Sequence, residues 1–100
     1  MLLVVWEYRV NPEHVEEFEA MYRPDGPWVE LFHRSPGFVS TTLMRDIRGG
    51  QRYMVSDRWS SLEAYEHFRA EHAEAYAALD ARGRRLYRSE NEVGRFDFLS

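Results

Sequence analysis

The order of the apolar patterns along this chain leaves few folds open to it. Four stretches rich in β-branched and aromatic residues predict strands, namely 2–10, 38–46, 52–59 and 93–99. Stretches with the helical spacing of apolar residues lie between the first two strands and between the last two, at 12–34 and 61–82. The order β-α-β-β-α-β predicts an α+β, ferredoxin-like fold, in which a four-stranded antiparallel sheet carries its helices on one face.

Local signals mark where the helices begin and where one of them breaks. Asn11 and Pro12 have the residue types expected for the N-cap and the first residue of the first helix. The sequence RPDGP at 23–27 should divide that helix into two pieces, because its prolines and glycine do not fit a regular helix. Ser60, with a glutamate three residues later, predicts a capping box before a helix that continues to about Arg82.

Composition and charge exclude several classes of function. A chain of 100 residues predicts a single domain, 1–100, and its net charge of −4 offers no basic field for nucleic acid. The absence of cysteine excludes disulfides, thiolate nucleophiles and cysteine metal sites. Charges at Glu7 and Arg9 interrupt the apolar N-terminal stretch too early for a signal peptide or a membrane span. We therefore expect a cytoplasmic protein that binds neither nucleic acid nor membrane.

Such a sheet would leave one of its faces without helices. The apolar and aromatic residues that alternate along 2–10 should face the helices, and so should Phe96 and Phe98. The opposite face would then hold Leu3, Val5, Glu7, Arg9, Val93, Arg95, Asp97 and Leu99. Apolar residues mixed with opposite charges suit burial against another protein surface. We therefore expect a homodimer in which the two sheets pack face to face.

The segments VVWEYRVNPEHVEEFEAMY and DRWSSLEAYEHFRAEHAEAY, with the hairpin and the last strand, resemble the antibiotic biosynthesis monooxygenase domain of the dimeric α/β-barrel superfamily. The resemblance covers nearly the whole chain and includes the Trp59–Ser60 junction before the second helix. It implies a homodimer whose sheets form a barrel, with a small hydrophobic pocket between helices and sheet in each subunit. Some members oxygenate phenols without metal or flavin, others cleave haem, and many have no known reaction, so the fold alone does not fix the function.

One histidine stands out among the residues that should line this pocket. At about 100° per residue, a single stripe of the helix 61–82 collects Tyr65, Phe68, His72, Tyr76 and Leu79. His72 lies near the centre of that stripe, where apolar surroundings would keep it neutral and able to accept a proton. The alternative is a core histidine whose ring bonds a tyrosine hydroxyl or the backbone.

Other side chains would complete the pocket. Tyr8 could donate a hydrogen bond to a developing oxyanion. The aromatic walls would be Trp6, Trp28, Phe32, Tyr65, Phe68 and Tyr76. The break at 23–27 could open the mouth of the cavity, or it could only change the direction of the chain. Ser40 and Thr42 share a strand face with Phe38 and could point their hydroxyls into the same space.

We expect neither a metal nor a cofactor. His14 and His67 each have a helical neighbour that is acidic, but both pairs lie on charged faces without a third ligand. There is no glycine-rich nucleotide loop. The haem-cleaving relatives use an asparagine, a tryptophan and a histidine at places that Tyr8, Phe68 and Ala78 hold here, which makes a haem-binding or haem-degrading protein a minor alternative.

The favoured hypothesis is a cofactor-independent monooxygenase acting on a small planar phenol or quinol. His72 would be the base, Tyr8 the oxyanion donor, and the aromatic residues the walls of the substrate pocket. The alternative is a non-catalytic dimer of the same fold that binds a small aromatic molecule.

Overall fold

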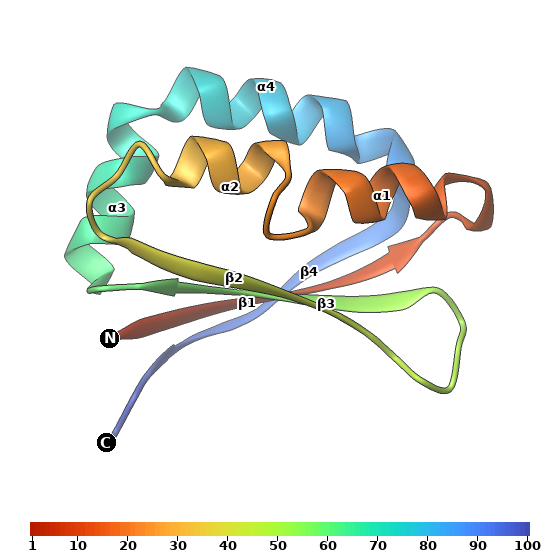
Figure 1. Ribbon diagram of the computed structural model, residues 1–100, viewed down its shortest axis with the longest axis horizontal. Coiled ribbons are helices and arrows are strands. Elements are labelled where there is room, and N and C mark those ends of the chain that lie inside the picture. Colours follow the sequence, from red (N-terminus) through yellow and green to blue (C-terminus); the bar gives the residue numbers. More distant parts are fainter.

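The computed structural model describes residues 1–100 as one antiparallel sheet with all its helices on one face (Figure 1). The strands are β1 (Leu2–Val10), β2 (Phe38–Arg45), β3 (Arg52–Trp59) and β4 (Tyr87–Asp97), in the spatial order β2-β3-β1-β4. The helices are α1 (Val15–Tyr22), α2 (Pro27–Phe32), α3 (Leu62–Glu71) and α4 (Ala73–Gly83), with short 3-10 turns at Pro12–His14 and Arg84–Leu86. The predicted ferredoxin-like α+β fold is confirmed. None of the helices is both long and apolar enough to cross a bilayer.

The predicted N-cap position of Asn11 is confirmed, whereas the predicted cap at Ser60 is wrong by one residue. Asn11 occupies the cap position, but its amide donates to the Arg85 carbonyl at 3.0 Å, so it ties the first turn to the end of the second helical segment. At α3 the capping side chain is Ser61, one residue later than predicted, and its hydroxyl accepts from the Ala64 N–H at 3.0 Å. Both serines have the right chemistry, so the sequence alone does not choose between them.

The break between α1 and α2 is packed tightly. Gly26 forms the N-cap of α2, and a Cβ added there would lie 2.6 Å from the Ala20 carbonyl oxygen. Any larger residue would therefore push the two helices apart. The close contact makes this segment a fixed change of direction in the structure.

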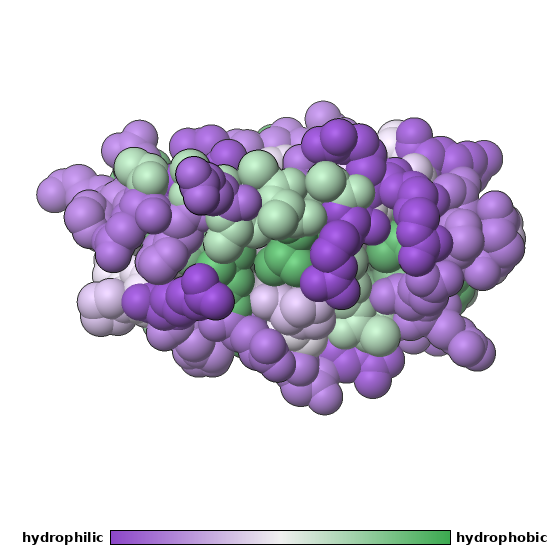
Figure 2. Space-filling view, turned by 90° about the horizontal axis from the view of Figure 1, so that it is seen from above, coloured by the Kyte–Doolittle hydropathy of each residue, from purple (hydrophilic) through white to green (hydrophobic).

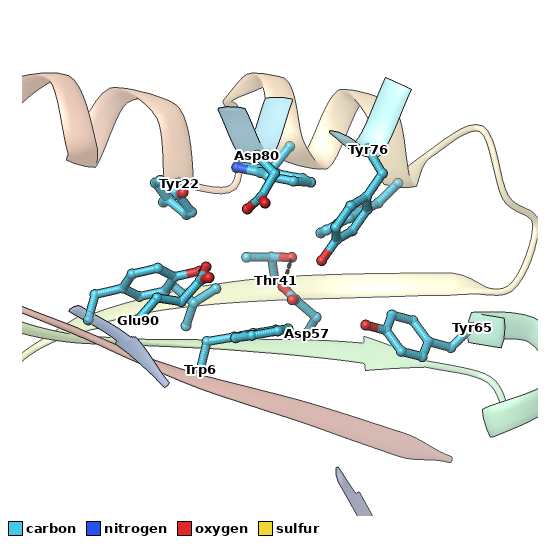
Figure 3. Close-up of a pocket in the computed structure, with 12 residues that line it drawn as sticks. Trp6, Tyr22, Thr41, Asp57, Tyr65, Tyr76, Asp80 and Glu90 are labelled. Atoms are coloured by element: carbon cyan, nitrogen blue, oxygen red, sulfur yellow. Dashed lines mark hydrogen bonds between the residues drawn. The ribbon is translucent and has the colours of Figure 1, made fainter. Parts of the chain in front are cut away.

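The long second helix breaks at His72, which the sequence pattern did not reveal. Its backbone dihedrals, φ −112° and ψ 29°, are not helical, so α3 ends and α4 begins in a new direction. The 100° rotation per residue used to place the apolar stripe therefore holds within each helix and fails across the break. Tyr65 and Tyr76 still point toward the same space (Figure 3). His72 lies at the bend between the two helices.

Strand β4 is longer than predicted and carries two register shifts against β1. One shift lies where Val5 pairs with Gly94 and the next residue, Trp6, pairs with Glu92. Because a bulge of one residue exchanges the two faces of a strand, Phe96 pairs with Leu3 on the bare face. The prediction that Phe96 and Phe98 face the helices is wrong.

The same bulge turns Arg95 toward the helices. Arg95 binds Glu92 at 2.9 Å and its guanidinium lies over the Tyr65 ring at 5.3 Å from the centroid. On the bare face, Arg58 covers the Phe98 ring at 5.1 Å from the centroid.

Aromatic rings fill the space between the helices and the sheet. Trp59 and Phe68 are almost completely buried, with ring centroids 5.0 Å apart, and Phe32 packs edge-on against both. Viewed from the helix side, hydrophilic residues surround a strip of more hydrophobic ones (Figure 2). A shallow groove lies there between α1 and α4, and Arg85 binds Glu17 at 2.5 Å beside it.

Candidate active site

A cavity lies between the sheet and the helices, and every strand contributes to its lining (Figure 3). Twelve side chains form it, and eight of them are hydrophobic. The rings are Trp6, Tyr8, Tyr22, Trp28, Phe32, Tyr65 and Tyr76, and the remaining residues are Thr41, Val55, Asp57, Asp80 and Glu90. The sheet and the helices thus surround a small space with aromatic rings and three carboxyl groups.

The sheet end of this space holds a buried carboxyl group. Asp57 is only 5% exposed and accepts a 2.6 Å hydrogen bond from the Thr41 hydroxyl. Burial raises the pKa of Asp57 to about 7, and the hydrogen bond from Thr41 only partly opposes this effect. Asp57 can therefore exchange a proton with a ligand near neutral pH.

A register shift in β2 decides which hydroxyl reaches the cavity. Between Phe38 and Ser40 the pairing with β3 slips, so Thr41 pairs with Asp57 on the helix side. Ser40 pairs with Arg58, whose partner on β1 is Leu3 of the bare face. The prediction that Ser40 and Thr42 face the cavity is wrong, because it assumed an uninterrupted alternation.

A second carboxyl group lies at the β4 end of the cavity. The Tyr8 hydroxyl donates to Glu90 Oε2 at 2.8 Å, although Glu90 as a whole is exposed at the cavity edge. Burial raises the pKa of Tyr8, and it also raises the pKa of Glu90. Above the cavity, Asp80 extends from α4 and pairs with Arg84 at 3.1 Å on its outer side.

Two buried polar atoms in the cavity wall have no hydrogen-bond partner. They are the Tyr22 hydroxyl and the Trp28 indole N–H, on residues that are 4% and 6% exposed. The two groups lie near each other without forming a well-aligned hydrogen bond. Gly83 leaves room for the Tyr22 hydroxyl, since a Cβ there would lie 2.6 Å from it. Buried polar atoms without partners are costly, so a ligand that bonds them would be stabilised.

The free space is small in this structure. About 30 Å³ is open to the centre of a water molecule, which is enough for one or two waters. A planar aromatic ligand therefore needs side chains of the helices to move aside. Arg69 contacts this wall, with its guanidinium 3.9 Å from the centroid of the Tyr76 ring and a 2.9 Å hydrogen bond to the Tyr65 hydroxyl.

Comparison with known families decides the assignment. Residues 1–79 match the model of the antibiotic biosynthesis monooxygenase family. The chain belongs to this family. The sequence matches no curated protein.

Solved structures share the fold of this monooxygenase-family chain over almost its whole length. SnoaB from Streptomyces nogalater, described as a cofactor-independent oxygenase, has 22% identity and a TM-score of 0.82, covering 99% of this chain and 93% of its own. A Nitrosomonas europaea protein assigned provisionally to the same family has 13% identity and a TM-score of 0.77, with both chains fully covered. A Pseudomonas aeruginosa protein has 16% identity and a TM-score of 0.74, covering 99% and 94%. At these identities the likeness establishes the fold alone.

The cavity contains most of the predicted site residues and omits two. Six line the cavity, namely Trp6, Tyr8, Trp28, Phe32, Tyr65 and Tyr76. Phe68 lies in the core beside Trp59, and His72 lies at the helix break without lining the cavity. The His72 ring is 18% exposed and packs 5.2 Å from the Phe68 ring, centroid to centroid. Its predicted role as a base has no support from this geometry.

The sequence prediction missed the cavity's polar groups. Thr41 reaches the cavity because of the register shift in β2, and Glu90 because β4 begins early, whereas Asp57 follows the regular alternation of β3. One signal was available for Asp57, because it alternates with Tyr53, Val55 and Trp59 on the buried face of the hairpin strand. A carboxylate at a buried strand position is unusual enough to mark a site.

The cavity does not fit a haem. None of its lining residues is a histidine, so the lining offers no imidazole ligand for the haem iron. The structure also has no cluster of three or more histidine, cysteine, aspartate or glutamate side chains arranged to hold a metal ion.

Proposed function

We propose that this chain is a cofactor-independent monooxygenase that acts on a small aromatic phenol or quinol, with Asp57 as the proton acceptor. The observation that carries the proposal is the buried Asp57 carboxyl group, which lines a ring-walled cavity and has a pKa of about 7. Family membership and the fold shared with SnoaB support oxygenation as the reaction class.

The proposed reaction takes its electrons from the substrate. Asp57 removes a proton from a phenol, or from a carbon next to the ring, and the electron-rich anion then reacts with O2. At a CH2 carbon the balance is CH2 + O2 → C=O + H2O, so one oxygen atom enters the product and the other leaves as water. Tyr65 and Tyr76 present hydroxyl groups that can donate hydrogen bonds to the oxyanion as charge develops, and the Tyr8 hydroxyl can do so once it releases Glu90.

Oxygen uptake with an anthrone or a hydroquinone tests this function. We expect Asp57→Asn to lower kcat/KM by about 100-fold, the lower end of what a positioned general base contributes. Glu74→Gln on α4 is the matched control, because Glu74 is exposed and lies outside the cavity. The wild-type rate should rise with pH through about 7, since the acceptor works only when deprotonated. Tight binding without oxygen uptake would favour the alternative, a non-catalytic binding protein.

We also infer that two copies pack through the bare face of the sheet. Strongly exposed hydrophobic residues gather on this side and along the β4 end, namely Val39, Met44, Phe96, Phe98 and Leu99. Val5 and Leu3 lie among them, and the family resemblance implies the same arrangement. Sedimentation should give twice the 11.9 kDa chain mass, and Phe96→Glu should give monomers. A wild-type monomer at micromolar concentration would contradict this interface.

A further inference from the structure

The cavity has an unbalanced charge. Asp57, Asp80 and Glu90 all line it, whereas no arginine or histidine does. The chain has 13 basic residues, all of them arginine, so this arrangement does not reflect a lack of cations. Arg84 reaches Asp80 only from the outside, where its side chain is 68% exposed. No arginine that lines the cavity pairs with these carboxyl groups, although Arg84 also attracts the Glu90 carboxylate.

The aromatic rings give the same space a preference for positive charge. Seven of the twelve lining residues are aromatic, and the faces of such rings attract cations. Two of these rings already contact guanidinium groups of the chain. Arg69 stacks on Tyr76, and Arg95 lies over Tyr65.

The unpartnered atoms in the wall point independently to a ligand. The Tyr22 hydroxyl and the Trp28 N–H are buried without partners beside the carboxyl groups. The hydroxyl can accept a hydrogen bond from an ammonium group, and the indole can donate one to a ligand hydroxyl. A ligand that carries both an ammonium group and a hydroxyl would give hydrogen-bond partners to the Tyr22 hydroxyl and the Trp28 N–H.

We propose that the cavity recognises an aromatic ligand carrying an ammonium group, such as an arylalkylamine with a phenolic hydroxyl. The ammonium group binds near Asp80 and Glu90, while the ring lies among the aromatic walls with its hydroxyl toward Asp57 and Thr41. This inference rests on the proposed function for the phenolic end of the ligand. It adds the positive charge, which neither the family nor the fold specifies.

Three probes of similar size separate charge from shape. Tyramine carries an ammonium group, 4-ethylphenol is its neutral counterpart, and 3-(4-hydroxyphenyl)propionate carries a carboxylate. Binding is measured by calorimetry without oxygen, and quenching of Trp6 and Trp28 fluorescence reports whether the probe reaches the cavity. We expect tyramine to bind about tenfold tighter than 4-ethylphenol, and the carboxylate to bind weakest.

Asp80→Asn is the informative variant. Its partner Arg84 is exposed, so the fold should persist, and a thermal melt verifies this. The variant should lose most of the preference for tyramine and keep its affinity for 4-ethylphenol. Glu74→Gln removes the same charge from the exposed side of α4 and should keep the preference.

Three results would overturn the inference. They are equal or tighter binding of the neutral phenol, no binding of tyramine, and an equal loss of preference in the Asp80 and Glu74 variants. Because oxygen is absent, failure of the proposed oxygenation leaves this measurement unaffected. Conversely, oxygen uptake with neutral phenols alone would support the enzyme and contradict the ammonium site.

Discussion

The carboxyl groups on the two faces of the sheet have different partners. On the bare face, Glu7 forms an ion pair with Arg52, and Arg52 also binds Asp46 at 3.3 Å. On the cavity side, Asp57 and Glu90 accept hydrogen bonds from hydroxyl groups and meet no arginine inside the cavity. The Glu7 carboxylate on the bare face is thus neutralised within the chain, as burial against a protein surface requires of a charge. Charges in the cavity remain available to a ligand.

The largest expected effect comes from a matched pair of phenylalanines on the two sides. Phe68 is 1% exposed and Phe96 is 48% exposed. Phe68→Ala should lower the free energy of unfolding by about 3–5 kcal/mol, because it leaves a cavity among rings. Phe96→Ala should cost less than about 1 kcal/mol in a monomer but weaken a dimer. Urea unfolding at two protein concentrations distinguishes the cases, and a small loss in Phe68→Ala would contradict the described core.

Asp57→Asn should show how much the buried, charged Asp57 carboxylate lowers the free energy of unfolding. The unfolded chain releases this proton near pH 4, whereas the folded chain holds it until about pH 7. The folded state therefore binds more protons in between, and wild-type stability falls as the pH rises from about 4 to about 7. At pH 8 the free energy of unfolding of the variant should exceed that of the wild type by about 2–4 kcal/mol. Near pH 4 the two proteins should differ little.

Unfolding curves across this range verify the sign of the effect. The matched control is Glu74→Gln, because an exposed carboxyl group should leave the profile unchanged. An Asp57→Asn profile that still falls between about pH 4 and 7 would assign the effect to another group.

Tyr8→Phe should have a smaller effect. It removes the hydroxyl that donates to Glu90 at 2.8 Å, but water can replace that donor because Glu90 is exposed. The expected loss is about 0.5–1.5 kcal/mol of unfolding free energy. Oxygen uptake should fall by more than this loss of stability explains, since the hydroxyl also serves the proposed oxyanion. Unchanged uptake would remove Tyr8 from the site.

His72→Phe should have the smallest effect. The side chain of His72 makes no hydrogen bond and lies outside the cavity, so its replacement leaves no partner stranded. Stability should stay within about 0.5 kcal/mol, and binding and oxygen uptake should not change. Loss of uptake with stability intact would restore the sequence-based prediction that His72 is the base.

The sequence predicted the fold well because its evidence is spread over many residues. The alternation along β1 and β3 and the spacing along the helices each repeat several times, so one misplaced residue does not change the architecture. Five of the six predicted wall residues line the cavity, and so does Tyr8, the predicted hydrogen-bond donor. The directions of Thr41, Arg95 and His72 did not follow from these patterns, because each depends on a single irregularity. One-residue shifts in β2 and β4 placed Thr41 and Arg95 on the helix side, and one non-helical residue moved His72 away.

The bulged course of β4 also bears on how copies of this chain can associate. Strands β2 and β4 are the two edges of the sheet, and an open edge is a template for pairing with another chain. The two register shifts interrupt the regular ladder of β4 and increase its twist. A second strand would find few aligned partners along such an edge, so growth into fibrils is disfavoured. Contact through the bare face, in contrast, would stop at a dimer, because each copy would cover the bare face of the other.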